Sequence, residues 1–185
     1  NFCPISVYKN LKKTEKIINK IEKKYGKKIP ITWFIRCDDT VSKNLGHSGS
    51  FLSYISKFII TRDKKGDSFG IHPHLYRIKN LGHKIPKWSF ENRIKFQKDL
   101  IFRAAEGWKK YFNTYPLISR MGESLMNNNI AQALDSIGIK FDSTALPGRK
   151  RKDNFFNFNW INTPNRPYKP SLSDYRIPGK KKFRK

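Results

Sequence analysis

Short β-branched or aromatic runs alternate with segments of helical periodicity, and this alternation constrains the fold more than any other feature. We expect strands at residues 31–35, 69–75, 117–120 and 139–142. We expect helices before and between them, at residues 7–25, 51–62, 90–112 and 123–137. Strands separated by helices of this length are typical of βαβ units, so the sequence predicts an α/β fold with a parallel sheet or barrel.

Local signals mark the ends of several elements. Ser6 is a candidate N-cap for the first helix, and Gly26 suits a left-handed C-cap. The β-branched and aromatic run 31–35 predicts a strand that is buried on both faces. After Ser143 the alternation stops, and prolines punctuate an extended, loop-rich stretch.

The charge of the chain has two explanations that the sequence leaves open. A formal net charge of +25 favours a polyanionic partner, such as nucleic acid, an anionic membrane surface or an acidic polysaccharide. Lysine supplies most of the cations, and isoleucine and asparagine are also abundant, so A/T-rich codon usage is a competing explanation. The basic tail 180–185 is expected to be a solvated end that follows a single domain over residues 1–179.

Several classes of protein are excluded. Two cysteines, Cys3 and Cys37, are too few for a disulfide scaffold or a four-cysteine zinc module. No apolar run approaches the roughly 18 residues of a membrane-spanning helix, and the chain does not start with a signal-peptide pattern. We therefore expect a cytoplasmic or membrane-peripheral location.

Ionisable residues follow every predicted strand. They are Asp38 and Asp39, His72 and His74, Arg120, and Asp142. Parallel α/β folds bind ligands at the carboxyl ends of their strands, so this edge is the predicted site. Because residues two apart on a strand share a face, both imidazoles can point at one divalent metal ion, such as zinc. The alternative is that the two histidines only stabilise a turn around Pro73.

The carboxylates and the arginine also have two interpretations each. One of Asp38 and Asp39 could be a metal ligand or general base, while the other caps a helix or pairs with a lysine. Arg120 could stabilise an oxyanion or form a salt bridge, for which Asp142 is the natural partner.

The order of these motifs resembles the polysaccharide deacetylase family, the NodB-homology group of metal-dependent carbohydrate esterases. Residues 31–36 (ITWFIR) resemble its Thr-Phe-Phe strand, and residues 70–77 (GIHPHLYR) resemble its histidine motif. Residues 119–122 (SRMG) occupy the place of its arginine motif, and residues 141–148 (FDSTALPG) that of an aspartate-bearing strand end.

The resemblance implies a distorted (β/α) barrel of about seven parallel strands, here incomplete. It also implies a zinc or similar ion held by one aspartate and two histidines, with a second aspartate as base, for hydrolysis of an N-acetyl group on a glycan or sugar-lipid precursor. His72 and His74 would be ligands, Arg120 would orient the base, and Asp142 would tether Arg120.

Three features differ from the family pattern. The histidines are two apart instead of four, the strand that carries the family's paired aspartates does not appear before the first helix, and the closing histidine motif is absent. We therefore expect a fragment or a degenerate homologue. The alternatives to a deacetylase are an inactive homologue and a basic polyanion- or nucleic-acid-binding protein; the tryptophans at predicted core positions argue against nucleic acid.

Overall fold

A parallel sheet forms the centre of the molecule. The computed structural model describes residues 4–79, 87–152 and 157–179 of the 185-residue chain. Four strands pair in parallel in the order β1-β2-β5-β6, with the bounds β1 (Thr32–Ile35), β2 (Ser68–Ile71), β5 (Ile118–Ser119) and β6 (Phe141–Asp142). The predicted α/β class with parallel strands is confirmed, and closure into a barrel stays a prediction.

The described residues contain six α-helices. They are α1 (Pro4–Tyr25), α2 (Asp39–Leu45), α3 (Ser50–Tyr54), α4 (Ser56–Asp63), α5 (Ile94–Phe112) and α6 (Asn128–Ser136). The predicted helix 51–62 is interrupted at Ile55, whose φ of −101° and ψ of 16° are not helical. None of these helices is both long and apolar enough to cross a bilayer.

Three of the predicted helix starts were wrong, whereas a predicted stop is confirmed. Helix α5 begins at Ile94 and not at residue 90. Helix α1 begins at Pro4, so Ser6 lies within its first turn instead of capping it; proline suits a first turn because it needs no N–H partner there. Gly26 has a φ of +62° and ends the helix as expected. Helix α6 starts later than predicted, after Asn127, whose side chain accepts from the Ile130 N–H.

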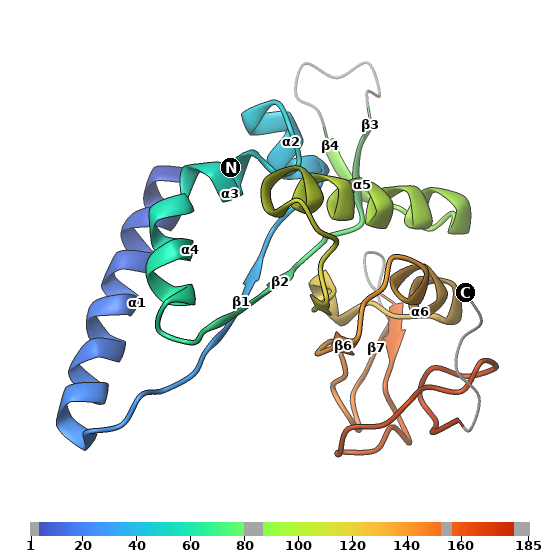
Figure 1. The fold of residues 1–185 in the computed structure, drawn as a ribbon. Coiled ribbons are helices and arrows are strands. Elements are labelled where there is room, and N and C mark those ends of the chain that lie inside the picture. The colour runs from blue at the N-terminus through green and yellow to red at the C-terminus, as the bar shows by residue number, and fades with distance from the viewer. Residues whose placement is uncertain (1–3, 80–86, 153–156, 180–185) are drawn as a thin grey trace.

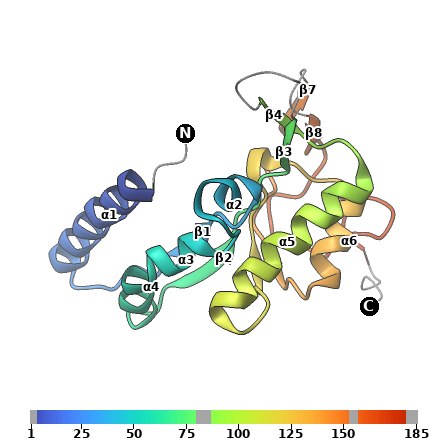
Figure 2. The same ribbon diagram turned by 90° about the horizontal axis from the view of Figure 1, so that it is seen from above.

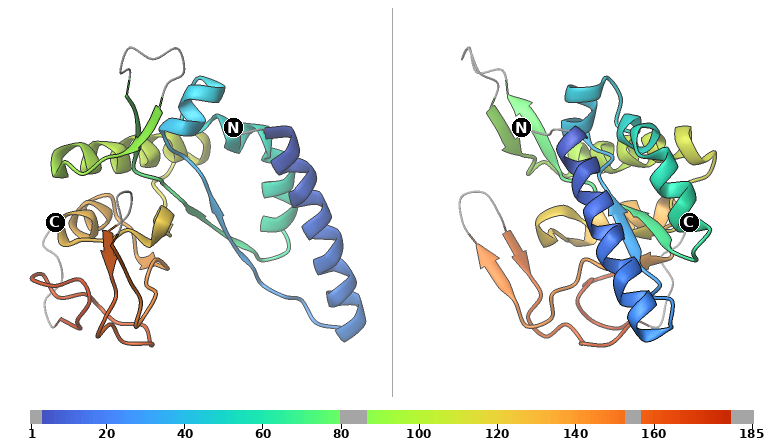
Figure 3. Two further views of the ribbon diagram at one scale, coloured as in Figure 1. Left: turned by 180° about the vertical axis from the view of Figure 1, so that it is seen from behind. Right: turned by 90° about the vertical axis from the view of Figure 1, so that its left-hand side faces the viewer.

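The arrangement separates two groups of helices. Helices α1 and α4 lie side by side at one end of the molecule, and the edge-to-face rings of Tyr8 and Tyr54 connect α1 to α3 (Figure 1). Helices α5 and α6 pack against each other, and α5 also contacts α3 (Figure 2). Figure 3 shows that the segment after β6 folds back beneath α6.

Two antiparallel hairpins extend from this framework. Strands β3 (Tyr76–Lys79) and β4 (Lys87–Phe90) form the first, directly after the histidines, and β7 (Lys150–Lys152) and β8 (Asn157–Asn159) form the second. The sequence predicted neither hairpin. The predicted tail 180–185 lies outside the described residues.

The core lies between the sheet and helices α2 to α6, but β1 is not buried on both faces as predicted. Only Ile35 of this strand is buried, because β1 is the edge of the four described strands. Beside it, Arg62 is fully buried and its guanidinium forms two hydrogen bonds with Asp67, at 2.6 and 3.0 Å. The indole of Trp33 donates to the same carboxylate at 2.5 Å.

Candidate functional site

The carboxyl ends of the four strands are aligned. The strand register places four residues in one row across the sheet: Ile35, Ile71, Ser119 and Asp142. The ladder continues one residue further, because the N–H groups of His72 and Arg120 donate to Ile35 O at 2.8 Å and Ile71 O at 3.0 Å. The next row therefore contains Arg36, His72 and Arg120.

The ring of His72 has a defined protonation pattern. Its Nδ1 lies 2.5 Å from the carbonyl oxygen of Arg120, and a carbonyl can only accept, so the proton is on Nδ1. The lone pair of the neutral ring is then on Nε2. Burial lowers the pKa of His72, because an imidazolium is poorly solvated there. The ring is thus neutral at neutral pH, with one nitrogen available as a ligand or base.

His74 lies beside His72 on the same side of the chain, as predicted. The two ring centroids are 4.9 Å apart at 88°, and Tyr76 stacks on His74 at 5.6 Å and 20°. The His74 Nδ1 is buried and has no hydrogen-bond partner in the described part of the chain; the nearest carboxylate oxygen, Glu123 Oε1, is 3.6 Å away. Burial, followed by the charge of Arg36, lowers the pKa of His74 to about 4.

Asp38 has a structural role in this geometry. Its Oδ1 accepts from the N–H groups of Thr40 and Val41, which caps helix α2. Its Oδ2 accepts from Arg36 Nε at 2.9 Å and from the His74 N–H at 3.1 Å. The carboxylate is buried and holds the backbone of His74 in place, so the cap that the sequence offered as one alternative is present. Its role as a ligand or base stays a prediction.

Asp39 points elsewhere. It lies in the first turn of α2 and its carboxylate accepts from Arg103 of α5 at 3.1 Å. Burial raises the pKa of Asp39, and Arg103 acts in the opposite direction. The structure thus separates the two adjacent aspartates, because Asp38 is the N-cap of α2 and Asp39 already belongs to its first turn.

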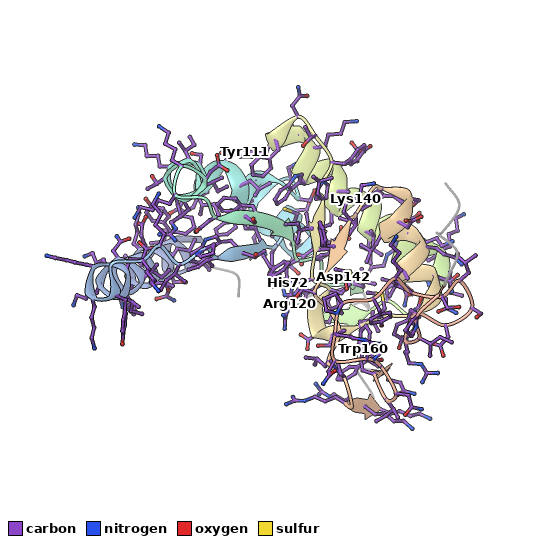
Figure 4. The ribbon with its side chains drawn as sticks, turned by 60° about the horizontal axis from the view of Figure 1, so that its bottom comes forward. His72, Tyr111, Arg120, Lys140, Asp142 and Trp160 are labelled. Atoms are coloured by element: carbon purple, nitrogen blue, oxygen red, sulfur yellow. The ribbon has the colours of Figure 1, made fainter. Side chains whose placement is uncertain are left out.

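Arg120 and Asp142 lie close to His72 at this edge of the sheet, as Figure 4 shows. The expected tether between them is not formed by a hydrogen bond in the described structure. Asp142 Oδ2 instead accepts from Ser119 Oγ at 2.5 Å and Thr144 Oγ1 at 2.9 Å, and both hydroxyls are buried. Burial raises the pKa of Asp142, whereas the hydrogen bonds from Ser119 and Thr144 act in the opposite direction.

Sequence reasoning missed four residues of this site. Arg36 follows β1 in the row of His72, and Gly122 leaves room for the His74 ring. Tyr76 Oη donates to Glu123 Oε1 at 3.3 Å. A strand-end position could have flagged Arg36, whereas no signal in the sequence pointed to Glu123, which has a left-handed φ of 55°.

Two side chains at this edge, His72 and His74, each have a ring nitrogen that could bind a zinc ion. Two neutral imidazoles fit, because the Nδ1–H of His72 is held by a carbonyl and the Nδ1 of His74 is unpartnered. A set of three His, Cys, Asp or Glu side chains close enough to hold an ion is absent from residues 4–79, 87–152 and 157–179. The two imidazoles are therefore candidate ligands only, and the metal stays a prediction. Glu123 is the nearest carboxylate to His74.

Two hollows in the described surface lie away from the histidines. One of about 420 Å³ lies between α5 and α6, and one of about 320 Å³ is bordered by His47 and Tyr111. Neither is lined by His72 or His74. The candidate site is thus the row at the strand ends and not either hollow.

Comparison with known proteins gives little further information. No family model and no curated protein matches the chain. A solved structure of the peptidoglycan deacetylase PdaC from Bacillus subtilis, in a mutant form, aligns with a TM-score of 0.38 and 17% identity over 67% of this chain and 48% of that chain. The chain thus spans about half the length of that structure. A likeness this weak carries no argument about barrel closure, activity or substrate.

Proposed function

We propose that the chain is a deacetylase-like hydrolase domain that removes the acetyl group from an N-acetylated glycan or its precursor. The observation that carries the proposal is the pair of partly buried, neutral imidazoles at the carboxyl edge of a parallel sheet. The resemblance of the surrounding motifs to polysaccharide deacetylases supports the reaction type. In this proposal the four strands belong to a distorted (β/α) barrel.

His72 and His74 would hold a divalent metal, with zinc as the best match for two imidazoles. Such an ion, when bound, lowers the pKa of water and polarises a carbonyl. The chain itself supplies the orientation of the rings: Arg120 O holds His72, and the Asp38 carboxylate holds the backbone of His74.

The reaction is an amide hydrolysis. The oxygen of water bonds to the acetyl carbon, the bond from carbon to nitrogen breaks, and the amine leaves with a proton while acetate is released. Arg120 has no side-chain hydrogen bond among the described residues, so its guanidinium is available to donate to an oxygen of the substrate. Because the lone pairs of both imidazoles would bind the metal, the base that accepts the proton of the attacking water would be a carboxylate, for which Asp38 stays the predicted candidate.

Zinc binding and acetate release test the proposal separately. Metal-free protein is titrated with zinc, and the variants His72→Ala and His74→Ala should each weaken binding by at least about tenfold, because each removes one ligand. His47→Asn is the matched control: His47 lies in the loop between α2 and α3, and asparagine can keep the bond that its Nδ1 accepts from the Gly49 N–H. Equal zinc affinity in all four proteins would refute the site.

The second measurement follows acetate released from N-acetylglucosamine oligomers. We expect zinc-dependent release by the wild type and strong loss in both alanine variants. Zinc binding without acetate release would identify an inactive homologue and would reject the hydrolase activity.

A further inference from the structure

The histidine centre is flanked by an arginine on each side. Strand β2, which leads into His72, lies between β1 and β5. Arg36 follows β1 and Arg120 follows β5, each one residue past the register row. Residues in one row of a parallel sheet share a face, so both guanidinium groups lie on the face of His72. Neighbouring strands are about 4.8 Å apart, which places the two arginine backbones about 10 Å apart.

The nearby carboxylates pair with one of these arginines and not with the other. Asp38 binds Arg36 through Nε and Nη2, and Nη2 also donates to Thr40 Oγ1, so Nη1 is the donor that Arg36 has left. Arg120 has neither an ion pair nor a side-chain hydrogen bond in the described structure. Asp142, the carboxylate nearest in the sheet, is held by Ser119 and Thr144. Two partly exposed arginines thus lie in one row with hydrogen-bond donors to spare.

Guanidinium groups bind planar carboxylates and tetrahedral phosphates through paired N–H donors. One guanidinium is enough to saturate the two oxygens of a carboxylate. Two guanidiniums on opposite sides of a histidine suit a group with three oxygens, because the fork of Arg120 and the Nη1 of Arg36 can take different oxygens of the same phosphate.

We propose that Arg36 and Arg120 bind a phosphate group of the substrate, so that the substrate is a phosphorylated N-acetyl sugar. The proposal rests on the proposed function for the acetyl group and adds the class of anion. The phosphate then contacts both guanidiniums, and the acetamide of the same sugar lies next to it, on the side of His74.

Calorimetric titrations with three sugars test the anion. The probes are N-acetylglucosamine, N-acetylglucosamine 1-phosphate and N-acetylmuramic acid, which are neutral, phosphorylated and carboxylated. The wild type should bind the phosphosugar at least about tenfold more tightly than the neutral sugar, and this advantage should shrink as salt is raised. An equal affinity for the neutral sugar, or a stronger preference for the carboxylated one, would overturn the proposal.

Variants locate the effect. Arg120→Gln should remove most of the advantage of the phosphosugar, and Arg36→Gln should do the same. Arg176→Gln removes one positive charge from the loop near the C-terminal end, where Arg176 pairs with Asp174, and should leave the advantage unchanged. A loss of equal size in all three variants would show a general charge effect and would refute the assignment to this row.

The two proposals fail separately. A protein that prefers the phosphosugar but neither binds zinc nor releases acetate would disprove the hydrolase and keep the anion site. A protein that releases acetate equally well from neutral and phosphorylated sugars would disprove the anion site and keep the hydrolase.

Discussion

The contact between Gly122 and the ring of His74 gives the sharpest test of the site geometry. A Cβ at position 122 would lie 2.5 Å from His74 Cγ, 2.6 Å from Nδ1 and 2.7 Å from Cδ2. The ring would have to retreat by about 0.7–0.9 Å to reach ordinary contact at 3.4 Å. It is packed against Tyr76 on one side and His72 on another, so it has little room to move.

The expected cost of Gly122→Ala follows from these distances. Overpacking of this kind costs about 1–3 kcal/mol. The φ of Gly122 is not in the left-handed region, so alanine brings no backbone strain. Alanine also restricts the unfolded chain more than glycine does, which raises the free energy of unfolding by about 0.4–1 kcal/mol. We expect a net destabilisation of about 1–2 kcal/mol, or roughly 2–8 °C in Tm.

A double-mutant cycle separates the clash from other effects. Gly122→Ala is measured in the wild-type background and in His74→Ala, by urea unfolding followed through tryptophan fluorescence. Without the ring there is no clash, so the same substitution should be neutral or slightly stabilising, and the coupling free energy should be about 1–3 kcal/mol. Equal effects in the two backgrounds would show that the ring does not occupy this space.

Three further predictions concern charge. Because the native pKa of His74 is about 4, the unfolded chain binds more protons than the native protein between about pH 4 and 6.5. The free energy of unfolding should therefore fall across this window as pH is lowered, by on the order of 3 kcal/mol for this group. In urea titrations, His74→Asn should flatten this pH profile. Asp67→Asn leaves the buried Arg62 without its counter-charge and should cost about 3–5 kcal/mol in the same assay; a cost below about 1 kcal/mol would contradict the pairing. Asp38→Ala removes the cap of α2 and should lower the free energy of unfolding by about 1–2 kcal/mol. Asp39→Ala removes only a half-exposed ion pair and should change it by less than about 0.5 kcal/mol. Similar losses in the two variants would refute the division of roles.

Hydrophobic periodicity was enough to predict the parallel sheet and most helices. The spacing of His72 and His74 predicted their shared side, because an extended chain alternates its side chains and no long-range contact is needed for that conclusion. The alternative of a cap at Asp38 was also available from the sequence, since aspartate before a helix is a strong local signal.

The rest depends on contacts between distant residues. The register that places Arg36 and Arg120 beside His72 cannot be derived from any one strand, because pairing is set by packing across the sheet. The strand Lys150–Lys152 has no apolar alternation, so its hairpin had no signal. Ile55 fits the helical pattern around it, yet the chain turns there between α3 and α4.

The acceptor that fixes the proton of His72 is a main-chain oxygen, which every amino acid at position 120 would provide. A substitution at position 120 can therefore remove the positive charge without changing the tautomer of His72. A homologue could exchange the arginine for a neutral residue and change which sugars it accepts, while the imidazole of His72, after the second of the four described strands, keeps the same nitrogen free.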